Sequence, residues 1–152
     1  MPKSNPKFSK KLIVWYLAHK RDLPWRNTAI PYYIWLSEII LQQTRVEQGL
    51  PYYQAFVSAY PTVNKLANAS EQEVLKLWQG LGYYSRARNL LATAKYISNE
   101  LNGVFPTTYK DLIKLKGVGD YTASAVASIC FNEATMVMFI ERLLVILEFL
   151  HL

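Results

Sequence analysis

The sequence has little cysteine, no long uncharged apolar run and almost no alternation of apolar and polar residues. Its single cysteine, Cys130, excludes a disulfide framework and a four-cysteine metal or iron–sulfur site built from this chain alone. No run reaches the roughly 18 uncharged residues of a membrane span, and MPKSNPKFSKK lacks the apolar core of a signal peptide. We therefore expect no membrane association and a cytoplasmic location.

The residues that are present suit one domain with a basic surface. The 152 residues are 51% hydrophobic, which is enough apolar material to bury a core. Seventeen Lys and Arg against eleven Asp and Glu leave a net charge of +6, which favours a polyanionic partner such as nucleic acid. A net charge of this size is also common in proteins that need it only for solubility, so the charge alone does not identify a nucleic-acid partner. We expect a monomer.

The sequence has residues typical of helix starts and ends but lacks the alternation of apolar and polar residues that strands show. We therefore predict an all-α fold with short connections, and the sequence contains no internal repeat. Prolines stand at helix starts, glycines stand near helix ends, and Ser70 and Glu73 have the spacing of a capping box. The helices predicted in chain order cover residues 11–20, 31–50, 51–60 from Pro51, the segment after Ser70, 85–101, 107–115 and the segment after about Asp120.

The segment LKGVGDYTASAVAS predicts a helix-hairpin-helix over residues 115–123, in which Gly117 and Gly119 flank Val118 in a tight turn. Glycines there let the backbone approach a phosphate, and the free N–H groups of the second helix attract an anion. Such a hairpin grips a DNA strand without reading its sequence. A purely structural turn is the alternative, and the nearby basic residues favour phosphate: Arg86, Arg88, Lys114 and Lys116.

The segment WLSEIILQQTRVEQ places a carboxylate among apolar neighbours, because Glu38 shares one helical stripe with Ile34, Leu41 and Arg45. Desolvation would raise the pKa of Glu38 and keep it protonated near neutral pH, as a general acid requires. A solvated helix glutamate is the alternative. Three residues with uncharged hydrogen-bonding side chains come next: Gln42, Gln43 and Thr44. Such side chains are suited to contacting base edges or to filling the gap left by an extruded base. The alternative is that they are ordinary helix-end residues.

The segment LWQGLGYYSRARNL interleaves aromatic residues with arginines. Tyr83 and Tyr84 follow a Gly-Leu-Gly turn, and Arg86 and Arg88 begin the next helix. This pattern suits insertion of a ring into a base stack together with phosphate contact. Both tyrosines would serve equally as core aromatics, so the DNA interpretation depends on the agreement of all three segments.

The segments LPWR, PYYIWLSEIILQQTRVE, LWQGLGYYSRARNL and LKGVGDYTASA resemble, in order and spacing, the A/G-specific adenine DNA glycosylases of the helix-hairpin-helix base-excision-repair superfamily over residues 8–135. The resemblance implies a monofunctional glycosylase that flips adenine out of mispairs with guanine or 8-oxoguanine in double-stranded DNA and hydrolyses its N-glycosidic bond. Glu38 matches the catalytic acid, and Tyr121 matches a tyrosine beside the reaction centre. In related bifunctional lyases a lysine occupies the place of Tyr121.

The same resemblance implies a DNA-binding and base-binding set. Gln43 and Tyr83 match residues that wedge into the duplex, and Trp25 and Arg26 match residues near the base pocket. The full set is Trp25, Arg26, Leu41, Gln42, Gln43, Thr44, Tyr83, Arg86, Arg88, Gly117, Val118, Gly119 and Thr122.

The chain departs from the family after ASICFNEAT. The family continues V-V-D-G-N-V-x-R-V, whose aspartate stabilises the positively charged sugar, whereas this chain reads MVMFIERLL and has no aspartate after Asp120. The full-length family also holds a 4Fe-4S cluster, which this chain cannot bind, and a C-terminal domain that senses 8-oxoguanine. We expect a helix and linker over 1–30 that packs on the missing cluster module, a six-helix lobe over 31–135, and an aberrant apolar tail over 136–152.

The sequence is compatible with two function classes. One is an adenine glycosylase by ancestry whose reaction is crippled by the missing aspartate. The other is a non-catalytic DNA-binding remnant. A chain too poorly closed to accumulate in the cell is a third outcome.

The tail has the pattern of an out-of-frame translation. The peptide Met-Val-Met-Phe-Ile-Glu at 136–141 is encoded by ATG GTN ATG TTY ATH GAR, and one base earlier the same bases read NAT GGT NAT GTT YAT HGA. Those codons permit Asp-Gly-Asn-Val-Tyr-Arg. We expect nucleotide sequencing of the gene to show this motif in the alternative frame, with a four-cysteine cluster further downstream. A Val137 codon ending in C would weaken this prediction, and an unrelated downstream sequence would end it.

Overall fold

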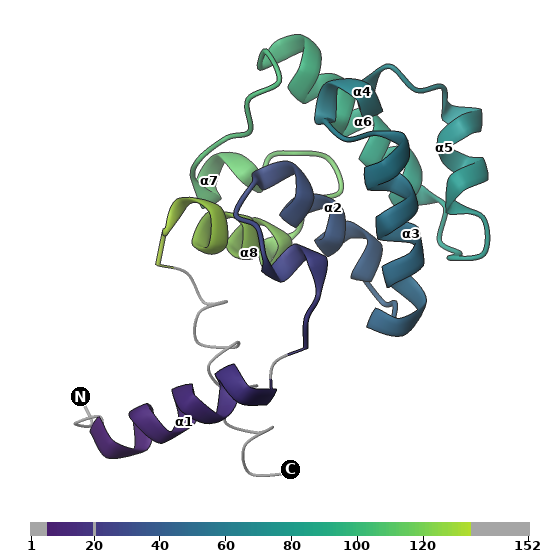
Figure 1. Ribbon diagram of the computed structural model, residues 1–152. Helices are drawn as coiled ribbons and strands as arrows, with labels where there is room; N and C mark the ends of the chain where they lie inside the picture. The colour runs from purple at the N-terminus through teal and green to yellow at the C-terminus, as the bar shows by residue number, and fades with distance from the viewer. Residues whose placement is uncertain (1–5, 20, 135–152) are drawn as a thin grey trace.

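The computed structural model describes residues 6–19 and 21–134, and all regular secondary structure in these ranges is helical (Figure 1). This confirms the all-α prediction. The elements are α1 Pro6–His19, the short 3-10 helix η1 Pro24–Arg26, α2 Pro31–Leu41, α3 Val46–Ala59, α4 Val63–Ala67, α5 Glu71–Trp78, α6 Ser85–Glu100, α7 Tyr109–Leu112 and α8 Asp120–Phe131. The predicted tail at 136–152 lies outside the described residues.

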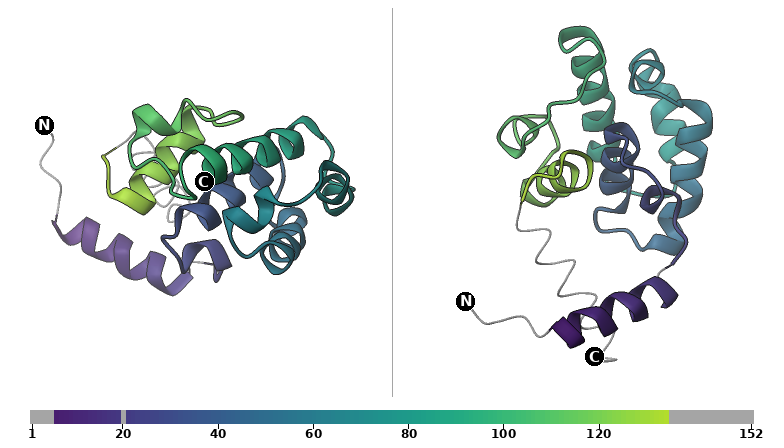
Figure 2. Two further views of the ribbon diagram at one scale, coloured as in Figure 1. Left: turned by 90° about the horizontal axis from the view of Figure 1, so that it is seen from above. Right: turned by 60° about the vertical axis from the view of Figure 1, so that its left-hand side comes forward.

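Helix α2 occupies the centre of the lobe. It packs against α3, α6 and α8, while α4 and α5 pack on α6 and α7 packs on α8 (Figures 1 and 2). Seven of its eleven residues are buried, as expected for a helix that is apolar all round. Between Ile34 and Ile40 only Glu38 is not fully buried.

Large aromatic side chains are among the most deeply buried residues of the core. Trp78 and Trp35 are at most 1% exposed, and they pack edge-on against Phe56 and Phe105 with ring centroids 5.9 and 5.5 Å apart. Such contacts favour aromatic pairs beyond simple burial. These contacts join α3 to the end of α5, and α2 to the segment that follows α6.

Several predicted helix ends are confirmed. Ser70 and Glu73 form a capping box at the start of α5, with the Ser70 amide donating to Glu73 Oε2 at 2.8 Å. The Gly103 amide donates to Ile97 O at 2.9 Å after Asn102 and Gly103 turn left-handed, so α6 ends where Asn-Gly predicted. Helix ends set by such local interactions can be predicted from the sequence without knowledge of the tertiary structure.

The predicted boundary between helices 31–50 and 51–60 is wrong. Helix α2 ends at Leu41, α3 begins at Val46, and Pro51 lies inside α3 instead of starting it. Gln43 ends α2 by taking a left-handed backbone with φ 54°. Arg45 is consequently the N-cap of α3 and not part of the α2 stripe with Glu38.

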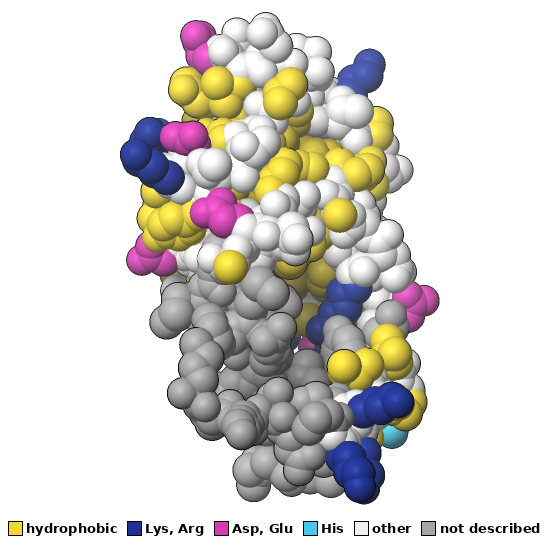
Figure 3. Space-filling model, turned by 90° about the vertical axis from the view of Figure 1, so that its left-hand side faces the viewer, with side chains coloured by type: hydrophobic (Ala, Val, Ile, Leu, Met, Phe, Trp, Pro, Cys, Tyr) yellow, Lys and Arg dark blue, Asp and Glu magenta, His cyan; other side chains and the backbone are white. Residues whose placement is uncertain are grey.

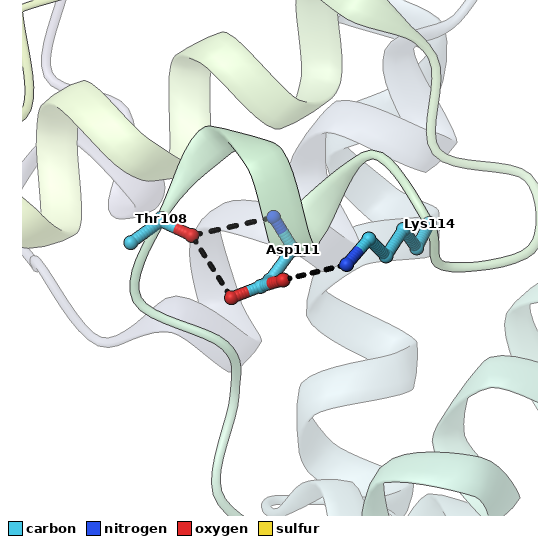
Figure 4. Close-up of polar contacts among 3 residues, drawn as sticks. All are labelled: Thr108, Asp111 and Lys114. Atoms are coloured by element: carbon cyan, nitrogen blue, oxygen red, sulfur yellow. Dashed lines mark hydrogen bonds and ion pairs between the residues drawn. The ribbon is translucent and has the colours of Figure 1, made fainter.

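Helix α7 is shorter than the predicted 107–115. The Thr108 side chain caps it by accepting a hydrogen bond from the Asp111 amide at 3.3 Å, and the helix ends at Leu112 (Figure 4). The chain then turns several times before α8. Helix α1 is longer than the predicted helix 11–20 at its N-terminus, because it begins at Pro6 rather than at residue 11.

Helix α1 lies apart from the other helices in Figures 1 and 2. Its apolar side chains Ile13, Val14 and Leu17 are each more than half exposed. The prediction that residues 1–30 form a unit of their own stays a prediction. Among the described residues, no helix is long and apolar enough to cross a membrane.

Cys130 lies near the end of α8 and packs, half-buried, against the core. Burial raises the pKa of its thiol from 9.0 to about 11, because desolvation disfavours the thiolate. At pH 8 this two-unit rise leaves about 100-fold less thiolate. We expect iodoacetamide to alkylate the folded chain about 100-fold more slowly than the urea-unfolded chain, with the difference shrinking as the pH approaches 11. Equal rates in both states would contradict the burial.

Candidate functional site

The turn between α2 and α3 carries the two glutamines that follow Glu38 and Leu41. Gln42 is the C-cap of α2, and its Nε2 donates to Thr122 Oγ1 on α8 at 3.3 Å. The Gln43 side chain is exposed, and its left-handed backbone turns the chain away from the helix axis. The structure therefore ties Gln42 to the start of α8 and leaves Gln43 at the surface.

The loop between α5 and α6 presents a second exposed side chain. Tyr83 is 69% exposed and has a left-handed backbone with φ 47°. The Trp78 indole donates to Gly82 O in the same loop at 3.0 Å. Tyr84 is 38% exposed. The alternative that Tyr83 is a core aromatic is thereby excluded.

Arg86 has partners that differ from the predicted phosphate. Its Nη1 donates to the carbonyl oxygens of Ile39 at 3.2 Å, of Ile40 at 3.0 Å and of Gln42. Its Nη2 lies 3.4 Å from Gly82 O in the tyrosine loop. Burial lowers the pKa of this guanidinium. Arg86 thus donates to carbonyl groups at the C-terminus of α2, so both of its Nη atoms have partners within the protein.

Arg88 is exposed and forms an ion pair on the surface. Its Nε lies 3.1 Å from Glu71 Oε1, and both side chains are more than half exposed. Exposed pairs of this kind contribute little stability. The prediction that Arg88 contacts phosphate stays a prediction.

The predicted hairpin connects α7 to α8. Val118 is 7% exposed and anchors the turn in the core, while Gly117 takes φ +76°. Gly119 is the N-cap of α8 and has an extended backbone, and a Cβ added there would meet nothing within 4 Å. No side chain caps this helix, so its first N–H groups lie beside an open glycine surface.

Lysines next to the hairpin carry the nearby positive charge. Lys114 Nζ lies 2.9 Å from Asp111 Oδ1 (Figure 4), and this contact, followed by the Thr108 hydroxyl, holds the pKa of Asp111 below its usual value. Lys116 is exposed, and its carbonyl accepts from Thr93 at 2.7 Å. Figure 3 shows acidic, basic and hydrophobic side chains interspersed on one face rather than a continuous basic field.

The catalytic candidates lie on two helices that pack together. Glu38 is half-buried on α2, one turn before Gln42, and Tyr121 is 47% exposed in the first turn of α8 beside Thr122. The hydrogen bond between Gln42 and Thr122 joins these two segments. The raised pKa predicted for Glu38 stays a prediction.

The remaining predicted residues lie in η1 and at the turn between α2 and α3. Trp25, in η1, packs edge-on against Tyr53 of α3 with ring centroids 5.1 Å apart, and the Arg26 side chain is exposed. Leu41 and Thr44 are half-buried at the α2–α3 turn.

Polar residues on α6 were missed by the sequence analysis. Asn89 packs against Gly117, and its Cβ would lie 2.9 Å from a Cβ added to that glycine. Thr93 bonds the Lys116 carbonyl, as described above. With Arg86 these residues form a stripe at steps of three and four along α6, and this spacing was the available signal.

A small cavity lies where the hairpin, α6 and α2 meet. Its volume is about 30 Å³, which accommodates water but not a nucleobase. Trp35 and Arg86 line it, and Nε1 of Trp35 and Nε of Arg86 are buried without a hydrogen-bond partner among the described residues. Its other lining residues include Gln42, Asn89, Lys116 and Gly117.

The residues present do not fit an iron–sulfur cluster. The whole sequence contains one cysteine, and four thiolates are needed. In the described part of the chain, no three His, Cys, Asp or Glu side chains gather as metal ligands.

Comparison with known proteins places these features in a family. Residues 36–142 match the family described as HhH-GPD superfamily base excision DNA repair protein. The adenine DNA glycosylase of Buchnera aphidicola subsp. Baizongia pistaciae is 43% identical over 126 residues, which are 82% of this chain and 36% of that protein. The human adenine DNA glycosylase is 46% identical over 140 residues, covering 86% of this chain and 26% of that protein. The chain thus spans about a quarter to a third of these relatives.

Solved structures support the same fold. A thermostable thymine-DNA glycosylase superposes with a TM-score of 0.74 at 29% identity, covering 84% of this chain and 59% of that one. A trapped covalent intermediate of endonuclease III with DNA superposes with a TM-score of 0.68 at 20% identity, covering 81% and 57%. At that identity the second likeness concerns the fold alone.

Proposed function

Because the chain belongs to the HhH-GPD superfamily of base excision DNA repair proteins, we propose that it is the DNA-gripping lobe of an adenine DNA glycosylase. The observation that carries this proposal is the pair of exposed side chains, Gln43 and Tyr83, held in left-handed loops beside the hairpin and its uncapped helix. We assign residues 31–135 to this lobe and residues 1–30 to a leading helix and linker. The chain acts as a monomer.

The proposed ligand is double-stranded DNA in which adenine faces guanine or 8-oxoguanine. The N–H groups at the start of α8 bind one phosphate, and Lys116 and Arg88 contact others. Gln43 and Tyr83 enter the base stack as adenine leaves it, and they offset the loss of stacking. Trp25 and Arg26 line the route to the base pocket.

The proposed chemistry is hydrolysis of the bond between C1′ of the sugar and N9 of adenine. Glu38 gives its proton to the adenine ring, so the base leaves as a neutral molecule with the bonding electron pair. Water then adds to C1′ and releases a proton. Tyr121 borders the reaction centre. The positive charge that develops on the sugar has no aspartate to stabilise it after Asp120, which favours a second candidate: DNA binding without cleavage.

Binding should depend steeply on salt, because each phosphate neutralised by the protein releases counterions. We expect the Kd for a mispaired duplex, measured by fluorescence anisotropy, to rise linearly with salt on logarithmic axes. Lys116→Ala should reduce the slope by about 1. Lys65→Ala is the matched control, since Lys65 is also exposed but lies on α4, which does not pack on α7 or α8. Salt-independent binding, or none at low salt, would overturn the proposed partner.

A further inference from the structure

Two residues other than glycine and asparagine take a left-handed backbone among the described residues, and both lie in loops of the candidate site. Gln43 has φ 54° and Tyr83 has φ 47°, and they are separated by forty positions in sequence. Side chains of this kind rarely adopt that conformation. Each loop therefore needs an interaction from outside itself to hold it.

Arg86 supplies an interaction to both loops. Nη1 donates to Gln42 O in the glutamine turn, and Nη2 lies 3.4 Å from Gly82 O in the tyrosine loop. The Thr44 hydroxyl, on the other side of Gln43, lies 3.4 Å from Nη1. The Arg86 guanidinium thus contacts the residues on both sides of Gln43 and the residue before Tyr83.

Two aromatic rings lie close to the Arg86 guanidinium. Its central carbon lies 5.0 Å from the centroid of the Trp78 ring and 5.9 Å from that of Tyr83. Trp78 is fully buried, so it is a rigid support, whereas Tyr83 is the exposed ring that the loop presents. A cation over an aromatic face is attracted to it. The same guanidinium therefore holds Tyr83 by its ring and its loop by a carbonyl.

We propose that Arg86 is a positioning residue that joins the glutamine turn and the tyrosine loop into one rigid unit, so that Gln43 and Tyr83 enter DNA together. The insertion of these two side chains rests on the proposed function, but the tie between the loops does not. Lysine cannot replace Arg86, because a single ammonium lacks the planar fork and the flat face that reach both loops.

Hydrogen exchange in the free protein tests the tie without DNA. The Thr44 amide donates to Leu41 O at 3.2 Å and the Leu81 amide donates to Trp78 O at 3.1 Å, so each loop has a protected reporter. Arg86→Lys should speed exchange at both amides together, by about tenfold or more. Arg88→Lys is the control, since this exposed arginine lies on the same helix and pairs with Glu71.

A change at one reporter only, or at neither, would overturn the tie. If Arg86→Lys does not fold, Thr44→Val removes one Arg86 partner from the glutamine turn alone. Thr44→Val should still speed exchange at the Leu81 amide, because a guanidinium that has lost its Thr44 partner is held less firmly against the tyrosine loop. An unchanged Leu81 amide in that variant would also overturn the tie.

A double-mutant cycle tests joint entry into DNA. In the parent chain, Gln43→Ala and Tyr83→Ala should weaken binding of a mispaired duplex non-additively, with a coupling of about fivefold or more. In the Arg86→Lys background the coupling should fall below about twofold. Multiplicative effects in the parent chain would refute joint entry. Absence of duplex binding would refute the proposed function, while the exchange result would still decide the tie.

Discussion

The 152-residue chain should bind a duplex containing A opposite 8-oxoguanine and release no detectable adenine from it. Glu38 can protonate the leaving base, but the sugar cation needs a nearby negative charge in a site that excludes water. Removing one preorganised electrostatic partner commonly lowers a rate about 10²–10³-fold or more. No aspartate follows Asp120 to supply that charge.

The measurement is single-turnover excision, in which alkali cleaves DNA at the abasic site that adenine release leaves. Joining the in-frame Asp-Gly-Asn-Val-Tyr-Arg continuation and the cluster domain should restore excision, and Glu38→Gln in that protein should abolish it again. Binding of the same duplex serves as the control for folding.

Robust excision by the chain as written would contradict this account and require a substitute carboxylate. Glu133 is unsuitable, because its Oε2 accepts the Tyr109 amide at 2.9 Å and caps α7. Glu141 lies outside the described residues, and Glu141→Gln would test it directly.

Substitution of the two hairpin glycines by valine should separate stability from DNA binding. Gly117→Val forces a branched side chain into a left-handed backbone and toward Asn89 Cβ at 2.9 Å, so it should destabilise the fold by about 1–3 kcal/mol. Gly119→Val adds its side chain to open space on an extended backbone. Its effect on stability should stay below about 1 kcal/mol, the scale of an N-cap change.

For DNA binding, Gly119→Val should have a larger effect than it has on stability. The side chain added by Gly119→Val would stand where a phosphate approaches the N–H groups of α8, so this variant should weaken duplex binding by about 10–100-fold. Urea denaturation and anisotropy titration give the two quantities. Unchanged duplex affinity for a stably folded Gly119→Val protein would contradict phosphate binding at this turn.

Sequence alone determined the features that depend on neighbours within one helical turn. The capping box at Ser70, the stop at Asn102–Gly103 and the hairpin between Gly117 and Asp120 follow from local side-chain and backbone chemistry. The all-α class follows in the same way, from hydrophobic spacing along the chain. The family resemblance added an adenine DNA glycosylase assignment because its motifs occupy those same local segments.

Tertiary structure decided where α2 ends and what Arg86 does. No glycine or proline stands after Leu41 to predict the end of the helix, and carbonyl groups near that end accept hydrogen bonds from an arginine more than forty positions later. An arginine in a basic segment also looks like a phosphate ligand until its partners are known. The donors of a guanidinium bind whichever oxygens the fold brings to them, and that proximity arises only when α2 and α6 pack together.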